Sequence, residues 1–198
     1  RWFGEAEKAG LYLPDSMTLA TVDANGAPNA RIVVLRGVDA RGFVFYTGQR
    51  SAKGRELAED PSAALCFHWN ELERQVRVRG EVDRMPFAES ARYFGTRPRA
   101  SQLSAAGSPQ SDVIQSRGDL EERVRELAEK IGAGPVPVPE HWAGFRLLPK
   151  EIEFWQGRES RLHDRFRYRR ISGTAEPDGT GTGTGTSTDE WIVGRLAP

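Results

Sequence analysis

Short runs of β-branched and aromatic residues, separated by tight-turn signals, constrain the fold of this sequence more than any other feature. Residues 17–22 form one such run, and Asn25 and Gly26 after it are a strong hairpin-turn signal. Residues 30–36 and 43–47 follow, with a second turn at 39–42. Strands joined by such short turns pair antiparallel, because a parallel pair needs a crossover of about a dozen residues or more. The sequence therefore predicts an antiparallel meander.

The rest of the chain continues this pattern and adds a few helices. Residues 74–82 alternate strictly between polar and apolar side chains, which predicts a strand with one face in the core. Ser51 is a suitable N-cap for a helix over residues 52–59, which Asp60 and Pro61 end. We expect further strands at 63–69, 142–148, 151–155, 166–171 and 191–196, and further helices at 2–10, 86–95 and 119–131.

Together these elements predict one α+β domain, mainly β, that spans residues 1–198 and consists of an antiparallel barrel with peripheral helices. Residues 173–188 are of low complexity, with repeated Gly-Thr pairs, and carry too few apolar side chains to fold on their own. We interpret them as a flexible Gly/Thr-rich loop between the last two strands.

Composition and charge disfavour several classes of protein. Lys plus Arg and Asp plus Glu each number 28, and the zero net charge disfavours nucleic-acid binding by bulk positive charge. The single cysteine, Cys66, excludes an internal disulfide framework and fits a reducing, cytoplasmic environment. No apolar run approaches about 18 residues, so we expect no membrane-spanning helix and no membrane partner. The three histidines lack the spacing of paired metal ligands, so we expect no metal site. Because the sequence begins at Arg1 rather than Met, we expect a preceding N-terminal segment.

Aromatic, cationic and imidazole side chains crowd into residues 152–165. One interpretation is an edge hairpin with a solvated arginine face. The other is a site for a flat anionic ligand, with a ring for stacking and cations for neutralising the charge. The residue types alone leave both interpretations open.

The order of residues in this segment resembles a known signature. Glu-Phe-Trp-Gln at 153–156, followed after four residues by Arg-Leu-His-Asp-Arg at 161–165, resembles the C-terminal signature of the pyridoxamine 5'-phosphate oxidase family. These flavin enzymes make pyridoxal 5'-phosphate. The resemblance extends over nearly the whole chain except the Gly/Thr-rich loop, with matching motifs in the family order at 31–35, 46–47, 72–76, 93–102, 110–111 and 195–198.

The resemblance implies an FMN-binding split β-barrel that forms a homodimer with FMN at the subunit interface. Residues 142–198 would be its dimerisation and active-site region. Lys53, at the start of a helix, would face the FMN phosphate, and Trp155 and Arg165 would reach the flavin from the partner chain. The implied FMN-binding residues are Arg31, Ile32, Val33, Val34, Leu35, Arg36, Tyr46, Thr47, Lys53, Gln75, Gln110, Ser111, Trp155 and Arg165.

The resemblance also implies the substrate and the reaction. Pyridoxamine or pyridoxine 5'-phosphate would be oxidised to pyridoxal 5'-phosphate with O2 as acceptor, releasing H2O2, and NH3 from the amine. Tyr93 and Arg97 are four residues apart and share one helical face. The resemblance implies that Arg161 and His163 are the catalytic residues. Because they alternate with Leu162, we expect both to point to one side of an extended segment. The implied substrate-binding residues are Arg36, Tyr93, Arg97, Ser101, Arg161 and His163.

Two positions depart from the family pattern. Arg36 stands where the family usually has Lys, and Ala52 where it usually has Arg. The cation missing at Ala52 predicts weaker FMN retention, which Arg50 or Arg55 could offset. A diverged branch of the family, the phenazine-biosynthesis flavin oxidases, shares the fold and the signature, so a different small aromatic substrate stays an alternative. Two others are a non-catalytic flavin or pyridoxal-phosphate binding protein and an arginine-rich nucleic-acid module at 158–170.

Overall fold

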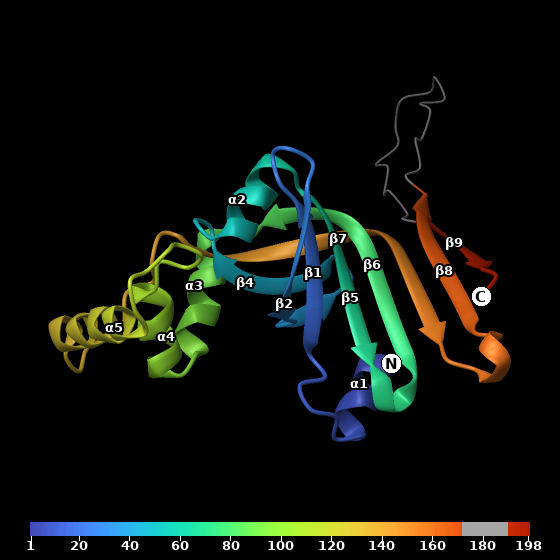
Figure 1. Ribbon diagram of the computed structural model, residues 1–198, viewed down its shortest axis with the longest axis horizontal. Helices are drawn as coiled ribbons and strands as arrows, with labels where there is room; N and C mark the ends of the chain where they lie inside the picture. The colour runs from blue at the N-terminus through green and yellow to red at the C-terminus, as the bar shows by residue number, and fades with distance from the viewer. Residues whose placement is uncertain (172–189) are drawn as a thin grey trace, which may run out of the picture.

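The computed structural model describes residues 1–171 and 190–198, so the loop expected at 173–188 lies outside the described residues. Nine strands of the described chain form one antiparallel sheet that curls into a half-barrel, and helices cover one end and the rim (Figure 1). The strands are β1 (Ser16–Val22), β2 (Pro28–Val34), β3 (Gly37–Asp39), β4 (Gly42–Gly48), β5 (Ser62–Trp69), β6 (Arg74–Arg84), β7 (Trp142–Gln156), β8 (Asp164–Ile171) and β9 (Glu190–Arg195).

The helices are short except for one. They are α1 (Trp2–Lys8), α2 (Ala52–Glu59), α3 (Phe87–Thr96), α4 (Arg99–Gly107) and α5 (Arg117–Ile131), with 3-10 turns at Asn70–Leu72 and Glu159–Arg161. The expected helices at 2–10, 52–59, 86–95 and 119–131 are confirmed within two residues at each end. Helix α4 was not expected, because its sequence is rich in Ala and Ser and only Leu103 is buried, so it carries no apolar periodicity.

Strand β7 connects the parts of the sheet. The strand order is β2-β1-β5-β6-β7-β4-β3. Outside this order, β8 pairs with β7, and β9 pairs with β8. The sequence predicted two strands, at 142–148 and 151–155, and this prediction was wrong. The register with β6 shifts between Arg79, which pairs with Glu151, and Gly80, which pairs with Pro149. Lys150 is therefore the extra residue of a β-bulge in β7, and the strand continues through Pro149. Gly80 is required there, because a Cβ atom would lie 1.9 Å from the carbonyl oxygen of Leu148.

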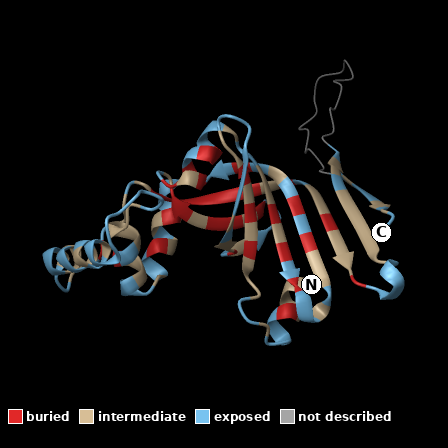
Figure 2. Cartoon of the chain, viewed as in Figure 1, coloured by how far each residue is buried: buried red, intermediate tan, exposed pale blue. Residues whose placement is uncertain are grey.

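Apolar side chains gather in two places. The larger core lies inside the half-barrel and includes Phe45, Leu65, Val78 and Leu147, all almost completely buried. A smaller core around Phe94, Leu103, Val136 and Trp142 attaches α3, α4 and α5 to one end of the sheet. Figure 2 shows the buried positions concentrated along β4, β6 and β7, whereas α5 has no buried residue. The smaller core matters for function because it positions α3 beside the mouth of the barrel.

The start of α2 is fixed by its expected N-cap. The backbone N–H of Gly54 donates to Ser51 Oγ (3.2 Å), and that hydroxyl donates to the carbonyl of Gly48 (2.7 Å). Ser51 is completely buried. Gly54 must be glycine, because a Cβ atom would lie 2.5 Å from the carbonyl oxygens of both Gly48 and Gln49. These contacts hold the end of β4 and the first turn of α2 as one unit.

We expect Ser51→Ala to lower the free energy of unfolding by about 1–2 kcal/mol, at the upper end for a lost N-cap. The reason is that the hydroxyl is buried and makes three hydrogen bonds, the third with Thr47 Oγ1 (3.4 Å). The matched control is Ser116→Ala, which removes the exposed cap of α5, where the hydroxyl accepts from Asp119 N–H (3.1 Å). That variant should lose about 0.5 kcal/mol. Urea denaturation measures both, and equal losses in the two variants would contradict the role given to the buried cap.

Candidate functional site

A cavity of about 290 Å³ opens between the edge strand β2, strand β4, helix α2 and the end of α3. Its lining brings together residues that are far apart in the sequence. Every lining residue except Trp142 was expected to bind cofactor or substrate. The lining consists of Arg31, Ile32, Val33, Val34, Arg36, Tyr46, Thr47, Lys53, Tyr93, Arg97, Gln110 and Trp142.

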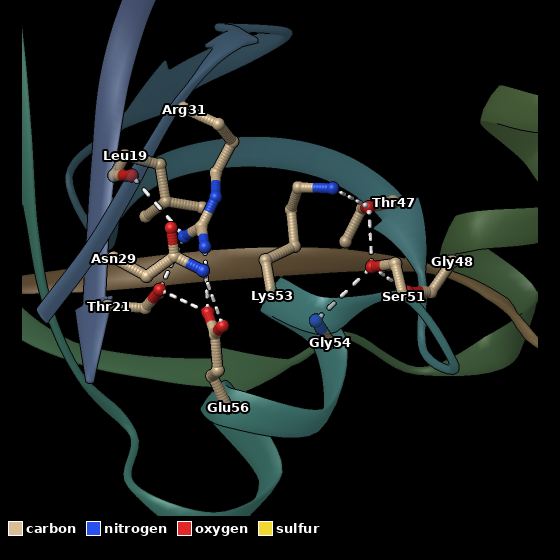
Figure 3. Close-up of polar contacts among 10 residues, drawn as sticks. All are labelled: Leu19, Thr21, Asn29, Arg31, Thr47, Gly48, Ser51, Lys53, Gly54 and Glu56. Carbon is tan, nitrogen blue, oxygen red and sulfur yellow. Dashed lines mark hydrogen bonds and ion pairs between the residues drawn. The ribbon is translucent and has the colours of Figure 1, made fainter. Parts of the chain in front are cut away.

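Two cations, Arg31 and Lys53, meet where β2 faces α2 (Figure 3). The Lys53 ammonium is buried and donates to Thr47 Oγ1 (3.3 Å). Burial, together with the charge of Arg31, lowers the pKa of Lys53, and the charge of Glu56 opposes the shift. Arg31 Nη2 forms an ion pair with Glu56 Oε2 (2.8 Å). Two neighbouring cations in a half-enclosed space suit a phosphate group.

A second pair of cations, Arg36 and Arg97, lines the same cavity. Arg36 pairs with Asp15 (3.3 Å) at a partly exposed position. The Arg97 guanidinium lies 5.3 Å from the ring centre of Trp142, and its Nη1 atom is buried without a hydrogen-bond partner among the described residues. Burial, followed by the charge of Arg36, lowers the pKa of Arg97, while Tyr93 opposes the shift. A buried donor without a partner is costly unless a ligand accepts from it, so Arg97 suits an anion.

Three nearly parallel aromatic rings form one wall of the cavity. The ring of Tyr46 lies 4.0 Å from that of Tyr93 and 5.0 Å from that of Trp142. Burial raises the pKa of the Tyr46 hydroxyl. Gly144 leaves room for this stack, since a Cβ atom there would lie 2.8 Å from Tyr46. Sequence reasoning missed Trp142, whose only signal was an aromatic residue at the start of a strand after a proline-rich connector.

The backbone at the end of β4 binds Gln110 across a long sequence distance. Gly48 N–H (3.0 Å) and Thr47 Oγ1 (3.1 Å) both donate to Gln110 Oε1. Glycine at 48 permits this approach, because a Cβ atom would lie 3.1 Å from the same oxygen. Ser111, expected beside Gln110, is exposed with φ at 76° and does not line the cavity.

The candidates for replacing the cation missing at Ala52 differ in their surroundings. Arg55 Nη1 donates to the carbonyl of Arg50, so that guanidinium already braces the turn before α2. Arg50 lines an adjoining cavity of about 220 Å³, which shares Gln110 with the first. Of the two, Arg50 is therefore better placed to add positive charge beside the first cavity.

Two more expected residues lie away from the cavity lining. Leu35 is 7% exposed and belongs to the core of the half-barrel. Ser101 lies in the first turn of α4, where its N–H donates to the carbonyl of Pro98 (2.9 Å). It follows Arg97 closely in the chain, but the cavity lining does not include it.

The remaining expected residues form a second cluster on β6, β7 and β8. In the sheet register, Trp155 pairs with Gln75 on one side and Arg165 on the other. The rings of Trp155 and His163 lie 4.7 Å apart, and His163 Nδ1 accepts from the backbone N–H of Arg158 (3.1 Å). None of these expected residues lines the cavity described above.

A buried carboxylate orients Arg165 in this cluster. Arg165 Nε donates to Glu153 Oε1 (2.8 Å), and its Nη1 donates to the carbonyl of Ala197 near the C-terminus (2.9 Å). Glu153 also pairs with Arg77 (3.4 Å). The hydrogen bond that Arg165 donates to Glu153 raises the pKa of Arg165 and so favours its charged form. Glu153 of β7 thus connects β6 and β8, and Arg165 extends the connection to the C-terminal segment.

The prediction that residues 161–163 form an extended segment was wrong. A 3-10 turn covers Glu159–Arg161, and Ser160 (φ 56°) and Arg161 (φ 61°) both adopt left-handed backbone conformations. The alternation argument fails, because it assumes strand geometry. Arg161 is exposed and His163 is half-buried.

Comparisons with known proteins identify the family. A family model described as "Pyridoxamine 5'-phosphate oxidase" matches residues 3–131, and one described as "Pyridoxine 5'-phosphate oxidase C-terminal dimerisation region" matches residues 142–198. The chain belongs to the pyridoxamine 5'-phosphate oxidase family. Curated relatives from Burkholderia thailandensis and Burkholderia pseudomallei, named pyridoxine/pyridoxamine 5'-phosphate oxidase, are 51% identical over 197 residues, 100% of this chain and 86% of theirs.

Solved structures support the same fold. PhzG from Burkholderia lata 383, in complex with tetrahydrophenazine-1-carboxylic acid, superposes with a TM-score of 0.85 at 30% identity and covers 100% of this chain and 89% of its own. A pyridoxamine 5'-phosphate oxidase-related, FMN-binding protein from Nostoc punctiforme, at 20% identity, has a TM-score of 0.74 and covers 100% and 95%. The expected family, the split β-barrel and the assignment as an oxidase are confirmed.

The described part of the chain lacks a membrane-spanning helix and a metal-binding cluster. No helix in residues 1–171 or 190–198 is long and apolar enough to cross a membrane. No group of three or more His, Cys, Asp or Glu side chains in those ranges is arranged to hold a metal ion.

We expect Glu153→Gln to lower the free energy of unfolding by about 1–3 kcal/mol, because it weakens charge-assisted hydrogen bonds to a nearly buried carboxylate. Glu151→Gln is the matched control on the same strand, since Glu151 is more exposed and its pairs with Arg79 and Arg167 are 3.9 Å long. That control should change stability by less than about 0.5 kcal/mol. Thermal and urea unfolding measure both variants, and a control as damaging as Glu153→Gln would contradict the assignment.

Proposed function

We propose that the protein is an FMN-dependent oxidase that converts pyridoxamine or pyridoxine 5'-phosphate to pyridoxal 5'-phosphate. O2 is the electron acceptor, H2O2 is released, and the amine substrate also releases NH3. The observation that carries the proposal is the cavity with two pairs of cations, Arg31 with Lys53 and Arg36 with Arg97, beside a wall of stacked rings. FMN and the substrate each carry one phosphate and one flat ring system, which matches two cationic pairs in one cavity.

The residues present fit FMN. Arg31 and the buried Lys53 would bind its phosphate, while the backbone of residues 31–36, with Tyr46, Thr47 and Gln110, would contact the rest of the molecule. The chemistry that bound FMN would supply at this site is acceptance of a hydride equivalent from C4' of the substrate, with O2 as the final electron acceptor. The chain's own contribution is to hold the two ring systems in contact and to exclude water from them.

At the substrate end, Arg97 would bind the phosphate through the Nη1 donor that now lacks a partner. Tyr93 and Arg36 line the same part of the cavity, and Ser101 begins the helix that follows. Trp142 would keep the Arg97 guanidinium in place by stacking beneath it.

We further propose that a second copy of the chain completes the site. Trp142 and Trp155 stand near opposite ends of β7, roughly 40 Å apart along the strand at about 3.3 Å per residue. One chain therefore does not bring both ends of β7 into one cavity. Gln75, Trp155 and Arg165 would reach the flavin, and Arg161 and His163 the substrate ring, from the partner. In this proposal residues 1–198 act as one domain, 142–198 supply the dimer contact, and Ile32, 65% exposed on the edge strand, is covered.

A second candidate function is the oxidation of a different small aromatic acid. The similarity to PhzG and the presence of Arg36, where the family usually has Lys, favour it. An arginine fork suits a carboxylate as well as a phosphate. The higher identity to the pyridoxine/pyridoxamine 5'-phosphate oxidases makes the vitamin B6 substrate the leading proposal.

An anaerobic titration separates these functions. Pyridoxamine 5'-phosphate should bleach the flavin absorbance of the FMN-loaded protein stoichiometrically, and admission of O2 should restore it with release of H2O2. Arg97→Gln should raise the KM for the phosphorylated substrate by about tenfold to a hundredfold, because a charge-assisted hydrogen bond is lost. Arg92→Gln, at an exposed position on α3, the helix that Arg97 follows as an extended C-cap residue, is the control. Bleaching only by a dihydrophenazine carboxylate would support the second function, and a yellow protein that no substrate bleaches would leave only a binding role.

The pKa of Lys53 gives a pH signature for cofactor binding. A phosphate stabilises the charged ammonium, so FMN affinity is highest below the pKa of the free protein's Lys53 and falls as the pH rises through it. Because that pKa is lowered, the loss should begin at a lower pH than an ordinary lysine would give. Riboflavin, which lacks the phosphate, should show no such loss. Flavin fluorescence titrations measure both ligands, and parallel pH profiles would contradict the role of Lys53.

A further inference from the structure

A carboxylate lies behind the two cations of the proposed FMN-phosphate site. Glu56, on α2, is 7% exposed and accepts from three side chains. Thr21 Oγ1 on β1 donates to Oε2 (2.5 Å), Asn29 Nδ2 on β2 donates to Oε1 (2.8 Å), and Arg31 Nη2 donates to Oε2 (2.8 Å). Figure 3 shows Glu56 pointing from the helix toward the two strands. Burial alone would raise the pKa of Glu56, but these three donors outweigh it and hold the pKa below its usual value.

These contacts fix one edge of the Arg31 guanidinium. Nη1 donates to Thr21 Oγ1 and to the carbonyl of Leu19 (3.5 Å), while Nη2 donates to Glu56. Within the described residues Nε of Arg31 has no hydrogen-bond partner, and Arg31 lines the cavity. The guanidinium therefore has donors left for a ligand while its orientation is already set, which removes the cost of ordering a long side chain.

Glu56 also acts on Lys53, which lies three residues before it on the same helix. The charged group that faces Lys53 from β2 is Arg31, and Glu56 faces it from α2. From β4, Thr47 accepts its hydrogen bond and Tyr46 lines the same cavity, with Tyr93 and Arg97 further along the lining. Arg31 disfavours the charge on Lys53 and Glu56 favours it, so Glu56 stabilises the charged form of the buried Lys53 beside the partly buried Arg31.

We propose that Glu56 is a positioning residue for the phosphate of the cofactor, acting through Arg31 and Lys53. The inference rests on the proposed function, in which these two cations bind the FMN phosphate. The direction of the change in phosphate affinity on removing the Glu56 charge is informative. Simple charge repulsion predicts that a carboxylate near an anion site weakens binding, so that its removal would strengthen it. If orientation and cation charge matter more, as we infer, removing the negative charge weakens phosphate binding instead.

The test compares FMN with riboflavin, which lacks the phosphate, on full-length protein freed of flavin. Flavin fluorescence titrations of Glu56→Gln at pH 7.5 should give a Kd for FMN about tenfold weaker than wild type, the size of one charge-assisted hydrogen bond, with riboflavin unchanged. The alkaline loss of FMN affinity should also start at a lower pH in this variant, because Lys53 has lost its counter-charge. Glu59→Gln, exposed on the same helix, is the matched control and should leave both ligands unchanged.

Glu56→Asp distinguishes charge from reach, because it keeps the carboxylate and shortens the side chain by one methylene. Its FMN affinity should be intermediate, with the alkaline loss at the wild-type pH. If Glu56→Gln does not fold, judged by near-UV circular dichroism, Glu56→Asp alone decides, and FMN affinity equal to wild type overturns the inference.

The outcomes distinguish the proposed role of Glu56 from the proposed function of the protein. Unchanged or tighter FMN binding by a folded Glu56→Gln, with wild type binding FMN normally, overturns the role of Glu56 and leaves the proposed function intact. Equal weakening of FMN and riboflavin also overturns it, because the effect would not act through the phosphate. A wild-type protein that binds neither flavin overturns the proposed function itself.

Discussion

The hydrogen-bonded ladder of β7 is the interaction on which the rest of the structure depends. β7 pairs with β6 along most of its length, with β4 at its start and with β8 at its end. The cavity wall, through Trp142 and Gly144, and the C-terminal signature, through Glu153 and Trp155, therefore belong to one strand. The bulge opposite Gly80 keeps that strand continuous across Pro149. Its length also separates the two clusters of expected site residues, which is why the proposed site combines them through a second chain.

Much of the fold could be predicted from local signals. The hairpin turn at Asn25 and Gly26 and the Ser51 cap both depend on neighbouring residues, and both are present in the structure. The continuity of β7 could not be predicted, because Pro149 reads as a break unless the partner strand is known to carry a glycine opposite it. Helix α4 was missed for a related reason, since its contacts with α5 and not its own periodicity stabilise it.

The sequence predicted the residues of the cavity better than the geometry of the second cluster on β6, β7 and β8. The motif on β2 and the residues Tyr46, Lys53 and Arg97 converge on one cavity, as the family resemblance implied. The turn at Arg161 was not predictable by alternation, because left-handed backbone at two successive residues leaves no pattern in the sequence. Glu56 was missed because it acts through other side chains, and Trp142 because only the fold brings its ring to the cavity wall.

The two pairs of cations are compensated in different ways, and the difference fits their proposed ligands. Arg31 and Lys53 are deeply placed beside a buried carboxylate, so the chain folds with that pair already oriented and neutralised in part. Arg97 has no carboxylate partner among the described residues and keeps a buried donor unpaired, while Arg36 is paired only at a partly exposed position. A ligand that stays bound through many turnovers gains from preorganisation. The unpaired donor of Arg97 destabilises the empty site and so favours its occupation by a phosphate, whether that phosphate belongs to substrate or to product. The proposed reaction keeps this phosphate unchanged, so one phosphorylated ligand replaces another after each turnover.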